Sequence, residues 1–374
     1  MISRRFLGNI SSRGGLVCLM ALCLTILIGQ GQALVLHPTG EPPVNWTGKP
    51  HDNVVGRWAT NASCVAVGPN HIITTSHQGG GVGNSVIFAG VSYKVAQEWI
   101  EPNEPGSLGN ADLRVCRIET PNDQPANLQH YVQLYTATDE VGQQPVFGGY
   151  GKGRGNTLLT NNNKPYAYDW NNSFGNTIQR WGTNRIDSFP PFVPPSPLET
   201  RGGAFLTEYL FVDFDDLNVT GATPYEAAVA EFDSGSGVFV PCGSSWKVLG
   251  LDAFVFGNLE GHGFGISAFR KSSNANPPDP ELLGVVRISA YAAWINGIVP
   301  VNNCITYLPD LDGDCLVANF ELNQLAQNWG RQDCSAGNNH CDGVDWFQDG
   351  SINLTDYGYL ASWWMASADL LTCN

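Results

Sequence analysis

Short runs of β-branched and aromatic residues, separated by Gly, Pro and Asn, recur from about Gly56 to Val299. Examples are residues 63–67, 71–74, 85–88, 144–147 and 247–251. Many short strands with frequent turns are typical of antiparallel sheets. The pattern therefore predicts a mainly β fold, either an antiparallel barrel or a sandwich.

Two segments of this region differ from the rest. Residues 156–224 are long, polar and in places rich in proline, which predicts large surface loops. Ile288, Tyr291, Ala292 and Ile295 recur at helical spacing and are followed by Gly297. This spacing predicts a helix over residues 287–296 that packs on the β structure.

The amino-terminal segment is typical of an export signal. Arg4, Arg5 and Arg13 precede an apolar run at residues 16–28, and Ala33 ends a group of small residues suited to cleavage. We expect a signal peptide over residues 1–33 and ordinary secretion, with twin-arginine export as an alternative. An uncleaved anchor is the other alternative, but the run is short for a span of roughly 20 residues. The mature chain should then have no membrane span and be secreted, periplasmic or at the cell surface.

Eight of the ten cysteines lie after this signal. An even number in an exported chain is compatible with disulfides. Cys334 and Cys341 are close enough in sequence to pair locally. Cys64 and Cys116 lie in strand-like apolar runs, where a buried thiol and a bridge are both open possibilities.

The chain of 374 residues carries a formal net charge of −15, which argues against nucleic acid as a partner because phosphates would be repelled. From residue 301 onward there are ten Asp or Glu and one Arg. The acidic charge is therefore concentrated in the last fifth of the chain.

A candidate nucleophile lies in Asp233-Ser234-Gly235, on a turn before an apolar run. A serine hydroxyl needs a base to take its proton and a carboxylate to orient that base. His77 follows a strand-like run, and Asp112 precedes another. The order His, Asp, Ser is a known order for this set of three, so we predict that His77, Asp112 and Ser234 form a catalytic triad.

Five motifs in order carry a resemblance to a known family. They are residues 63–77 ending in His77, Ala111-Asp112-Leu113, Asp233-Ser234-Gly235, residues 246–251 and residues 289–296. Over roughly Gly56 to Val299 the chain resembles trypsin-like serine proteases of the chymotrypsin fold, peptidase family S1, and we expect a domain of this kind over residues 34–300. The resemblance implies two six-stranded antiparallel barrels with the site between them, a peptide or protein substrate and no cofactor for catalysis.

The chain departs from the family at two positions. Phe232 replaces a glycine whose backbone N–H, with that of Ser234, forms the oxyanion hole of the family. Gln78 replaces a cysteine that would be bridged to the counterpart of Cys64, so the histidine segment must be held otherwise. Ala228 stands where a trypsin-like pocket carries Asp, which favours a neutral or apolar side chain in the substrate.

The resemblance also concerns Asp233, the residue before the nucleophile. We expect Asp233 to pair with a new amino terminus only if one is created near residues 54–57.

An internal repeat with a period of 35 residues follows Pro300. It aligns Asp310 with Asp345, Asp314 with Asp349, Glu321 with Asp356, Leu325 with Leu360, Ala326 with Ala361 and Trp329 with Trp364. Six matches at one offset indicate two copies of one structural unit over residues 301–374.

Each copy offers hard oxygen ligands at the spacing of a calcium loop. The first loop supplies Asp310, Asp312, Asp314, the carbonyl of Leu316 and Glu321. The second supplies Asp345, Asp349, the carbonyl of Ser351, Asn353 and Asp356, with Phe347 at a position that has no oxygen to give. We therefore predict structural Ca²⁺ in both copies.

A helix with an apolar stripe follows each loop. The stripes are Leu322, Leu325, Ala326 and Trp329 in the first copy, and Tyr357, Leu360, Ala361 and Trp364 in the second. They predict the shared core of a small α-helical module. The module resembles a type I dockerin, or more loosely a pair of EF-hand-like loops, and this implies a cohesin-like or surface-assembly partner.

The sequence therefore favours an exported serine endopeptidase that is tethered through a calcium-binding module. The main alternative is a catalytically impaired protease fold that serves as a surface or adhesion binding module. An esterase with the same triad is a third possibility, which the relative turnover of peptides and esters would distinguish.

Overall fold

The computed structural model describes residues 33–60, 62–101, 110–171, 178–187, 198–200, 203–205, 207–243, 245–255, 265–270, 280–299, 309, 311, 317 and 319–364. Strands dominate these residues, and the helices are few and short. The predicted mainly β class is confirmed. The expected signal peptide, residues 1–33, lies outside the described part except for Ala33.

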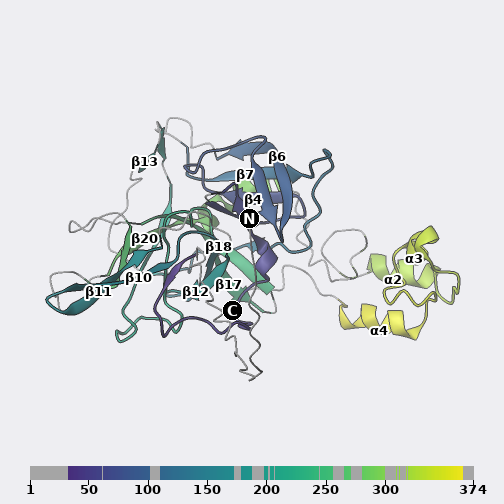
Figure 1. Ribbon diagram of the computed structural model, residues 1–374. Helices are drawn as coiled ribbons and strands as arrows, with labels where there is room; N and C mark the ends of the chain where they lie inside the picture. The colour runs from purple at the N-terminus through teal and green to yellow at the C-terminus, as the bar shows by residue number, and fades with distance from the viewer. Residues whose placement is uncertain are drawn as a thin grey trace, which may run out of the picture.

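Six antiparallel strands close into a barrel in the order β2-β3-β4-β7-β6-β5 (Figure 1). They are β2 (Val55–Trp58), β3 (Ala62–Ala66), β4 (His71–Thr74), β5 (Ser85–Phe88), β6 (Val91–Ile100) and β7 (Arg114–Glu119). Apolar side chains such as Ile72, Val86 and Ile118 fill its interior. The barrel carries the segment that leads to His77 and the segment that follows Asp112.

The second half of the β region forms a seven-stranded sheet. Its main path is β12 (Arg180–Thr183), β9 (Val146–Gly149), β17 (Gly237–Cys242), β18 (Ser245–Val255), β20 (Leu282–Arg287) and β15 (Tyr209–Asp213). The seventh strand, β8 (Gln133–Leu134), pairs parallel to β18. The turn that carries Ser234 leads into β17.

The predicted second barrel is found only in part. The described strands of this sheet have two edges, β12 and β15, rather than a closed ring. Asp187, just beyond β12, forms a single antiparallel bridge with Phe211 of β15. The edges therefore approach one another without a full ladder.

Part of the region predicted as surface loops is regular structure. A long hairpin of β10 (Arg154–Asn161) and β11 (Lys164–Trp170) pairs with β19 (Ile266–Ala268). The prediction was wrong here because several side chains of β10 are exposed, so this strand lacks the apolar alternation of a core strand. Two further pairs are β1 (Val35–Leu36) with β16 (Ala227–Ala228), and β13 (Leu198–Thr200) with β14 (Gly203–Phe205).

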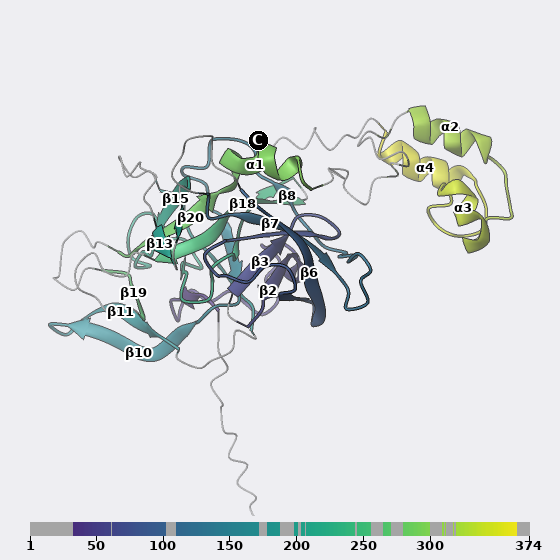
Figure 2. The same ribbon diagram turned by 90° about the horizontal axis from the view of Figure 1, so that it is seen from above.

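One apolar core joins the barrel to the sheet. It combines Ile73 and Val115 of the barrel with Val248 and Leu251 of the sheet. The predicted helix is α1 (Ile288–Asn296), which buries Ile288, Ala292 and Ile295 and ends at Gly297. Figure 2 shows α1 lying over β8 and β18. The barrel and the sheet thus pack on a shared core that fixes the loops between them.

The C-terminal residues form a small helical unit with its own core. Its elements are α2 (Asn319–Gln327), η2 (Ala336–Asn338), α3 (Asn339–Asp342) and α4 (Leu354–Ser362). A short helix, η1 (Asp52–Val54), precedes β2 in the β region. Among the residues described, every helix is too short or too polar to cross a lipid bilayer.

Candidate active site

The three predicted triad residues form one hydrogen-bonded line. His77 Nδ1 lies 2.6 Å from Asp112 Oδ2, and His77 Nε2 lies 2.7 Å from Ser234 Oγ. An ionised carboxylate can only accept, so Nδ1–H donates to Asp112 and Nε2 accepts from the serine hydroxyl. This is the tautomer in which His77 can take the proton of Ser234.

Asp112 is buried and held at three points. Its Oδ1 accepts 2.8 Å hydrogen bonds from the backbone N–H groups of Ser76 and His77. Its own backbone N–H donates to Thr207 Oγ1 at 2.8 Å. The carboxylate therefore fixes both the backbone and the ring of His77.

Gln78 anchors the histidine segment, the residues around His77, by hydrogen bonds. Its Nε2 donates to Thr75 Oγ1 at 2.8 Å, to Thr74 Oγ1, and at 3.4 Å to the carbonyl of Ser63. Cys64 is a free, buried thiol, as is Cys116, and burial raises the pKa of both thiols. Hydrogen bonds thus connect β3 to the histidine segment without a disulfide at Cys64.

Arg114 supports the same segment from β7. Its guanidinium donates to the carbonyls of Ser76, Gly79 and Gly80, the last two at 3.2 and 3.3 Å, and pairs with Glu98 at 3.2 Å. Neither Gln78 nor Arg114 was predicted to have this role. Only their closeness in sequence to His77 and Asp112 could have suggested it.

The serine turn has two residues with left-handed backbone. Phe232 has φ of +77° and Gly235 has φ of +78°. A Cβ on Gly235 would lie 2.3 Å from the carbonyl oxygen of Ser63 and 2.3 Å from Thr74 Oγ1. Only glycine fits at 235, whereas Phe232 adopts a conformation that L residues rarely take.

The backbone N–H groups of the turn alternate between paired and unpaired. Asp233 N–H donates to Ala230, and Gly235 N–H donates to Asp252. Within the described residues, the N–H groups of Phe232 and Ser234 donate no hydrogen bond. These two are the donors predicted for the oxyanion, and they are available to a ligand.

Asp233 is fully buried beneath the turn. Its carboxylate accepts from Gly151 N–H at 2.7 Å, from Ala230 N–H at 3.0 Å and from Leu34 N–H at 3.3 Å. Burial raises the pKa of Asp233 to about 7. The nitrogen beside Asp233 is that of Leu34, whereas residues 54–57 belong to η1 and β2. Pairing of Asp233 with a terminus created near residues 54–57 stays a prediction.

A second buried acid lies close to Asp233. Asp252 is 1% exposed, and neither of its carboxyl oxygens has a hydrogen-bond partner among the described residues. Burial, and then the charge of Asp233, raise the pKa of Asp252 well above its ordinary value. Its backbone carbonyl accepts from Gly235 N–H, so this acid contacts the serine turn.

Ala228 lies in β16, where it pairs with Val35 of β1, and its side chain is fully buried in the apolar core. No charge is present at this position. Its role in substrate preference stays a prediction.

The second predicted calcium loop lies within the described residues. Asp345 accepts from the N–H groups of Asp349 and Gly350, both at 3.1 Å. Asp356 accepts from Trp346 at 3.2 Å and Asn353 at 3.1 Å. Asp345 and Asp356 are buried, and no basic side chain of the described residues pairs with either.

Ser351 donates from its backbone N–H to Asp349 at 3.0 Å. Asp310, Asp312, Asp314 and Leu316 of the first loop lie outside the described residues. Glu321 is buried and accepts from Leu311 N–H at 3.1 Å. Within the described part of the chain, no three His, Cys, Asp or Glu side chains are placed to hold a metal ion. Calcium binding therefore stays a proposal.

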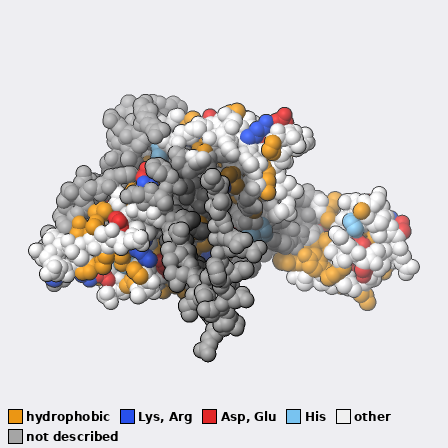
Figure 3. All heavy atoms as spheres, in the orientation of Figure 1, with side chains coloured by type: hydrophobic (Ala, Val, Ile, Leu, Met, Phe, Trp, Pro, Cys, Tyr) orange, Lys and Arg blue, Asp and Glu red, His pale blue; other side chains and the backbone are white. Residues whose placement is uncertain are grey.

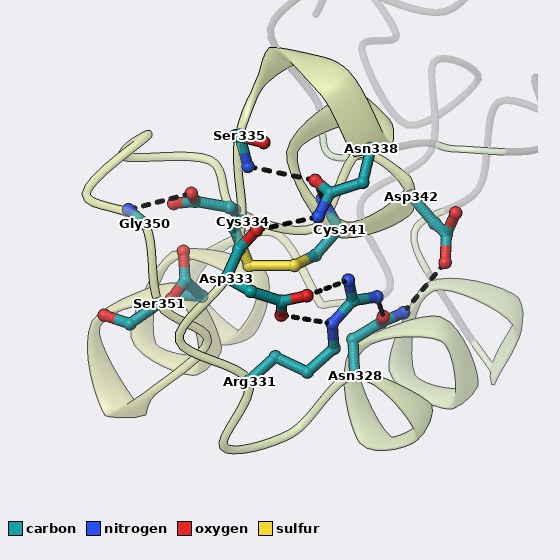
Figure 4. Close-up of a disulfide and its surroundings, with 12 residues drawn as sticks. Asn328, Arg331, Asp333, Cys334, Ser335, Asn338, Cys341, Asp342, Gly350 and Ser351 are labelled. Carbon is teal, nitrogen blue, oxygen red and sulfur yellow. Dashed lines mark hydrogen bonds and ion pairs between the residues drawn. A yellow bond between two sulfur atoms is a disulfide. The ribbon is translucent and has the colours of Figure 1, made fainter.

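The predicted local disulfide joins Cys334 and Cys341 (Figure 4). Beside it, Arg331 pairs with Asp333 at 2.9 Å and donates to Asn328 Oδ1 at 2.8 Å. Cys242 of the β region is also disulfide-bonded.

The predicted shared core of the helical unit is correct at only one position in each stripe. Leu325 and Leu360 are buried. The other residues of the two stripes are exposed: Leu322, Ala326 and Trp329 in the first, and Tyr357, Ala361 and Trp364 in the second. The buried acids explain the exposure of Leu322 and Tyr357, because Glu321 and Asp356 face inward and the next residue of each helix then points outward. Figure 3 shows apolar side chains on the surface of this unit.

No family model matches the sequence, and no curated protein matches it. Among solved structures, the chain is similar to neuropsin, a serine protease expressed in the limbic system of mouse brain. The identity is 15%, the TM-score is 0.40, and the match covers 66% of this chain and 94% of neuropsin. It is also similar to HBP, at 12% identity and a TM-score of 0.39, covering 67% of this chain and 95% of HBP.

Proposed function

We propose that the chain is an exported serine endopeptidase with a His77, Asp112 and Ser234 triad. The observation that carries this proposal is the continuous line from Asp112 through His77 to Ser234, with distances of 2.6 and 2.7 Å. Three residues from distant parts of the chain meet in the order and tautomer that nucleophilic catalysis requires.

The proposed reaction follows from these positions. Ser234 Oγ attacks the substrate carbonyl carbon while its proton passes to His77 Nε2. Asp112 keeps its hydrogen bond to Nδ1–H and stabilises the positive ring. The tetrahedral oxyanion accepts from the N–H groups of Phe232 and Ser234. His77 then protonates the leaving amine, which leaves an acyl group on Ser234. Water attacks this acyl carbon while His77 takes its proton, and His77 returns the proton to Ser234 Oγ as the acid product leaves.

A non-catalytic binding module is the second candidate, and Phe232 is the observation that favours it. A residue with a Cβ is disfavoured at φ of +77°, so a turn that relaxed would lose the Phe232 N–H as an oxyanion donor. Loss of one such donor lowers turnover by roughly 10²–10³-fold.

An active-site fluorophosphonate distinguishes these candidates. The purified chain should be labelled at Ser234, as located by mass spectrometry of its peptides, and Ser234→Ala should not be labelled. A folded, calcium-loaded chain that takes no label would refute the enzyme. Comparing the turnover of a peptide library with that of the matching p-nitrophenyl esters then distinguishes an endopeptidase from an esterase. In the same library, preferred cleavage after Lys or Arg would contradict a neutral pocket at Ala228.

For residues 301–374 we propose structural Ca²⁺ and a tethering role, with a cohesin-like or surface-assembly partner. In the second loop Asp345, Asp349, Asn353 and Asp356, with the carbonyl of Ser351, are hard oxygen donors of the kind that Ca²⁺ prefers. The cation would neutralise Asp345 and Asp356, which are 2% and 0% exposed.

Titration calorimetry of the full chain should show calcium binding that Asp356→Asn weakens. Asp333→Asn, at an exposed acid of the same unit, should leave the binding heat unchanged. Equal heats for the two variants would contradict the assignment. The proposed signal peptide, residues 1–33, places the protein outside the cytoplasm, and sequencing the amino terminus of the exported chain tests it.

A further inference from the structure

Phe232 holds a conformation that its own side chain disfavours. Its φ of +77° lies in the left-handed region, where a Cβ crowds the backbone. The neighbouring Gly235 has nearly the same φ without this penalty. The hydrogen bond from Asp233 N–H to the Ala230 carbonyl closes the turn around Phe232. A contact from outside the turn can favour this conformation further.

Lys152 supplies three such contacts. Its backbone N–H donates to the carbonyl of Glu231 at 2.8 Å. Its ammonium pairs with the carboxylate of Glu231 and lies 5.4 Å from the centroid of the Phe232 ring. One residue thus contacts the turn at the backbone before Phe232, at the Glu231 side chain and at the face of the Phe232 ring, where a cation is attracted.

The residue before Lys152 keeps it in place. Gly151 N–H donates to Asp233 Oδ1 at 2.7 Å. A Cβ on Gly151 would lie 2.5 Å from the backbone nitrogen of Asp233, so only glycine allows this approach. The Lys152 side chain is 15% exposed and that of Glu231 is 31% exposed, so the pair is partly shielded from water.

We propose that Lys152 is a positioning residue that holds Phe232 in its left-handed conformation and so keeps the Phe232 N–H available to the oxyanion. This inference rests on the proposed function. The Lys152 backbone N–H holds the same peptide through the Glu231 carbonyl in every side-chain variant. The ammonium adds to this hold through the Glu231 carboxylate and the Phe232 ring, and its loss shifts Phe232 toward a negative φ, which turns this N–H away from the oxyanion. Loss of this donor should weaken binding of the transition state more than binding of the substrate, because a substrate in its ground state carries no oxyanion.

The test compares four variants in p-nitrophenyl ester hydrolysis. Lys152→Met keeps the aliphatic stem and should lower kcat by about 10²-fold with KM changed less than about threefold. Lys152→Arg keeps the charge and should restore most of kcat. In Phe232→Gly, where glycine accepts the left-handed region, adding Lys152→Met should change kcat less than about threefold.

One control and one further test variant complete the design. Lys164→Met, at an exposed lysine of β11, should equal the wild type. Glu231→Gln removes the ion pair but keeps the backbone acceptor, and should lower kcat even if Lys152→Met does not fold.

The outcomes separate this inference from the proposed function. A wild-type chain that takes no fluorophosphonate at Ser234 would overturn the function and this inference with it. A labelled wild type with Lys152→Met at full kcat, or with an equal loss in the Phe232→Gly background, would overturn this inference alone.

Discussion

The histidine side of the site and its serine side are held by different means. On the histidine side, Asp112, Gln78 and Arg114 all donate or accept several hydrogen bonds with the segment around His77. On the serine side, Phe232 has a disfavoured φ, and Asp233 and Asp252 are buried acids with raised pKa values.

This difference extends through the β region. Among the described residues, every acid with a raised pKa lies in the second half of the β region. Besides Asp233 and Asp252, these acids are Asp187, Asp213, Asp215, Glu226 and Glu281. We expect the histidine side to respond mainly to loss of hydrogen bonds. The serine side should respond to pH and to small steric changes.

The largest expected effect is on the histidine side. Asp112→Asn keeps the shape of the side chain but lets an amide donate toward Nδ1, which favours the wrong tautomer of His77. We expect kcat to fall by roughly 10⁴-fold with little change in KM. Steady-state ester hydrolysis measures this fall. A variant within tenfold of the wild type would show that Asp112 does not orient His77.

Gly235→Ala tests the steric limit of the serine side. The new Cβ would meet the backbone oxygen of Ser63 at 2.3 Å, so the turn must shift and Ser234 must move from His77. We expect fluorophosphonate labelling to slow by at least about 10²-fold.

Gly79→Ala is the matched control for this prediction. Gly79 has a φ of +70° and nothing within 4 Å of a built Cβ. It should lose stability of about 1 kcal/mol from backbone strain alone and keep its labelling rate. Similar labelling rates for the two variants would contradict the steric argument.

The buried acids predict a pH-dependent stability. The pKa of Asp233 is about 7 in the folded chain, against an ordinary value of 3.8, so the folded state binds the proton more tightly. The stabilisation is complete below the ordinary pKa and is lost as the pH rises through the folded pKa. For the chain that retains residues 1–33, in which the Leu34 nitrogen is an uncharged amide, we expect Tm to fall by about 5 °C or more between pH 5 and pH 8.

Asp252→Asn sharpens this prediction, because the amide cannot titrate. Its Tm should fall less than that of the wild type over the same range and should exceed it at pH 8. Asp123→Asn, at an exposed acid of the barrel half, should follow the wild type. If Asp252→Asn follows the wild type at every pH, Asp252 is not a source of the effect.

The smallest expected effect concerns Gln78. Gln78→Met keeps the length of the side chain and removes the hydrogen bonds to Ser63 and Thr75. We expect a loss of roughly 1–3 kcal/mol in the free energy of unfolding and a fall of less than about tenfold in kcat. Gln97→Met, on the exposed face of β6, serves as the control in denaturant titrations. No difference between the two variants would show that the segment is held without Gln78.

The sequence predicted the parts of the site that have local signals. His77, Asp112 and Ser234 each lie at the end or start of an apolar run, and their order along the chain limited the choice. Helix α1 was predicted within one residue at its start, because its apolar spacing and Gly297 are local features.

The supporting contacts join residues far apart in the chain and have no such signal. Lys152 reaches Glu231 and Phe232, and Leu34 reaches Asp233, across long separations that only the folded structure reveals. The exposure of Leu322 and Tyr357 was missed for another reason. Apolar periodicity shows that a helix has a face, but not that the acids one residue earlier, Glu321 and Asp356, occupy the inward position.

The contact between Leu34 and Asp233 connects the predicted signal-peptide cleavage site with the serine turn. An amide nitrogen carries no charge, whereas a free amino terminus is mostly protonated at neutral pH. If the signal peptide ends at Ala33, cleavage turns the Leu34 nitrogen, 3.3 Å from the Asp233 carboxylate, into an ammonium group. Hydrolysis of the Ala33–Leu34 bond on export would therefore also place a positive charge beneath the serine turn.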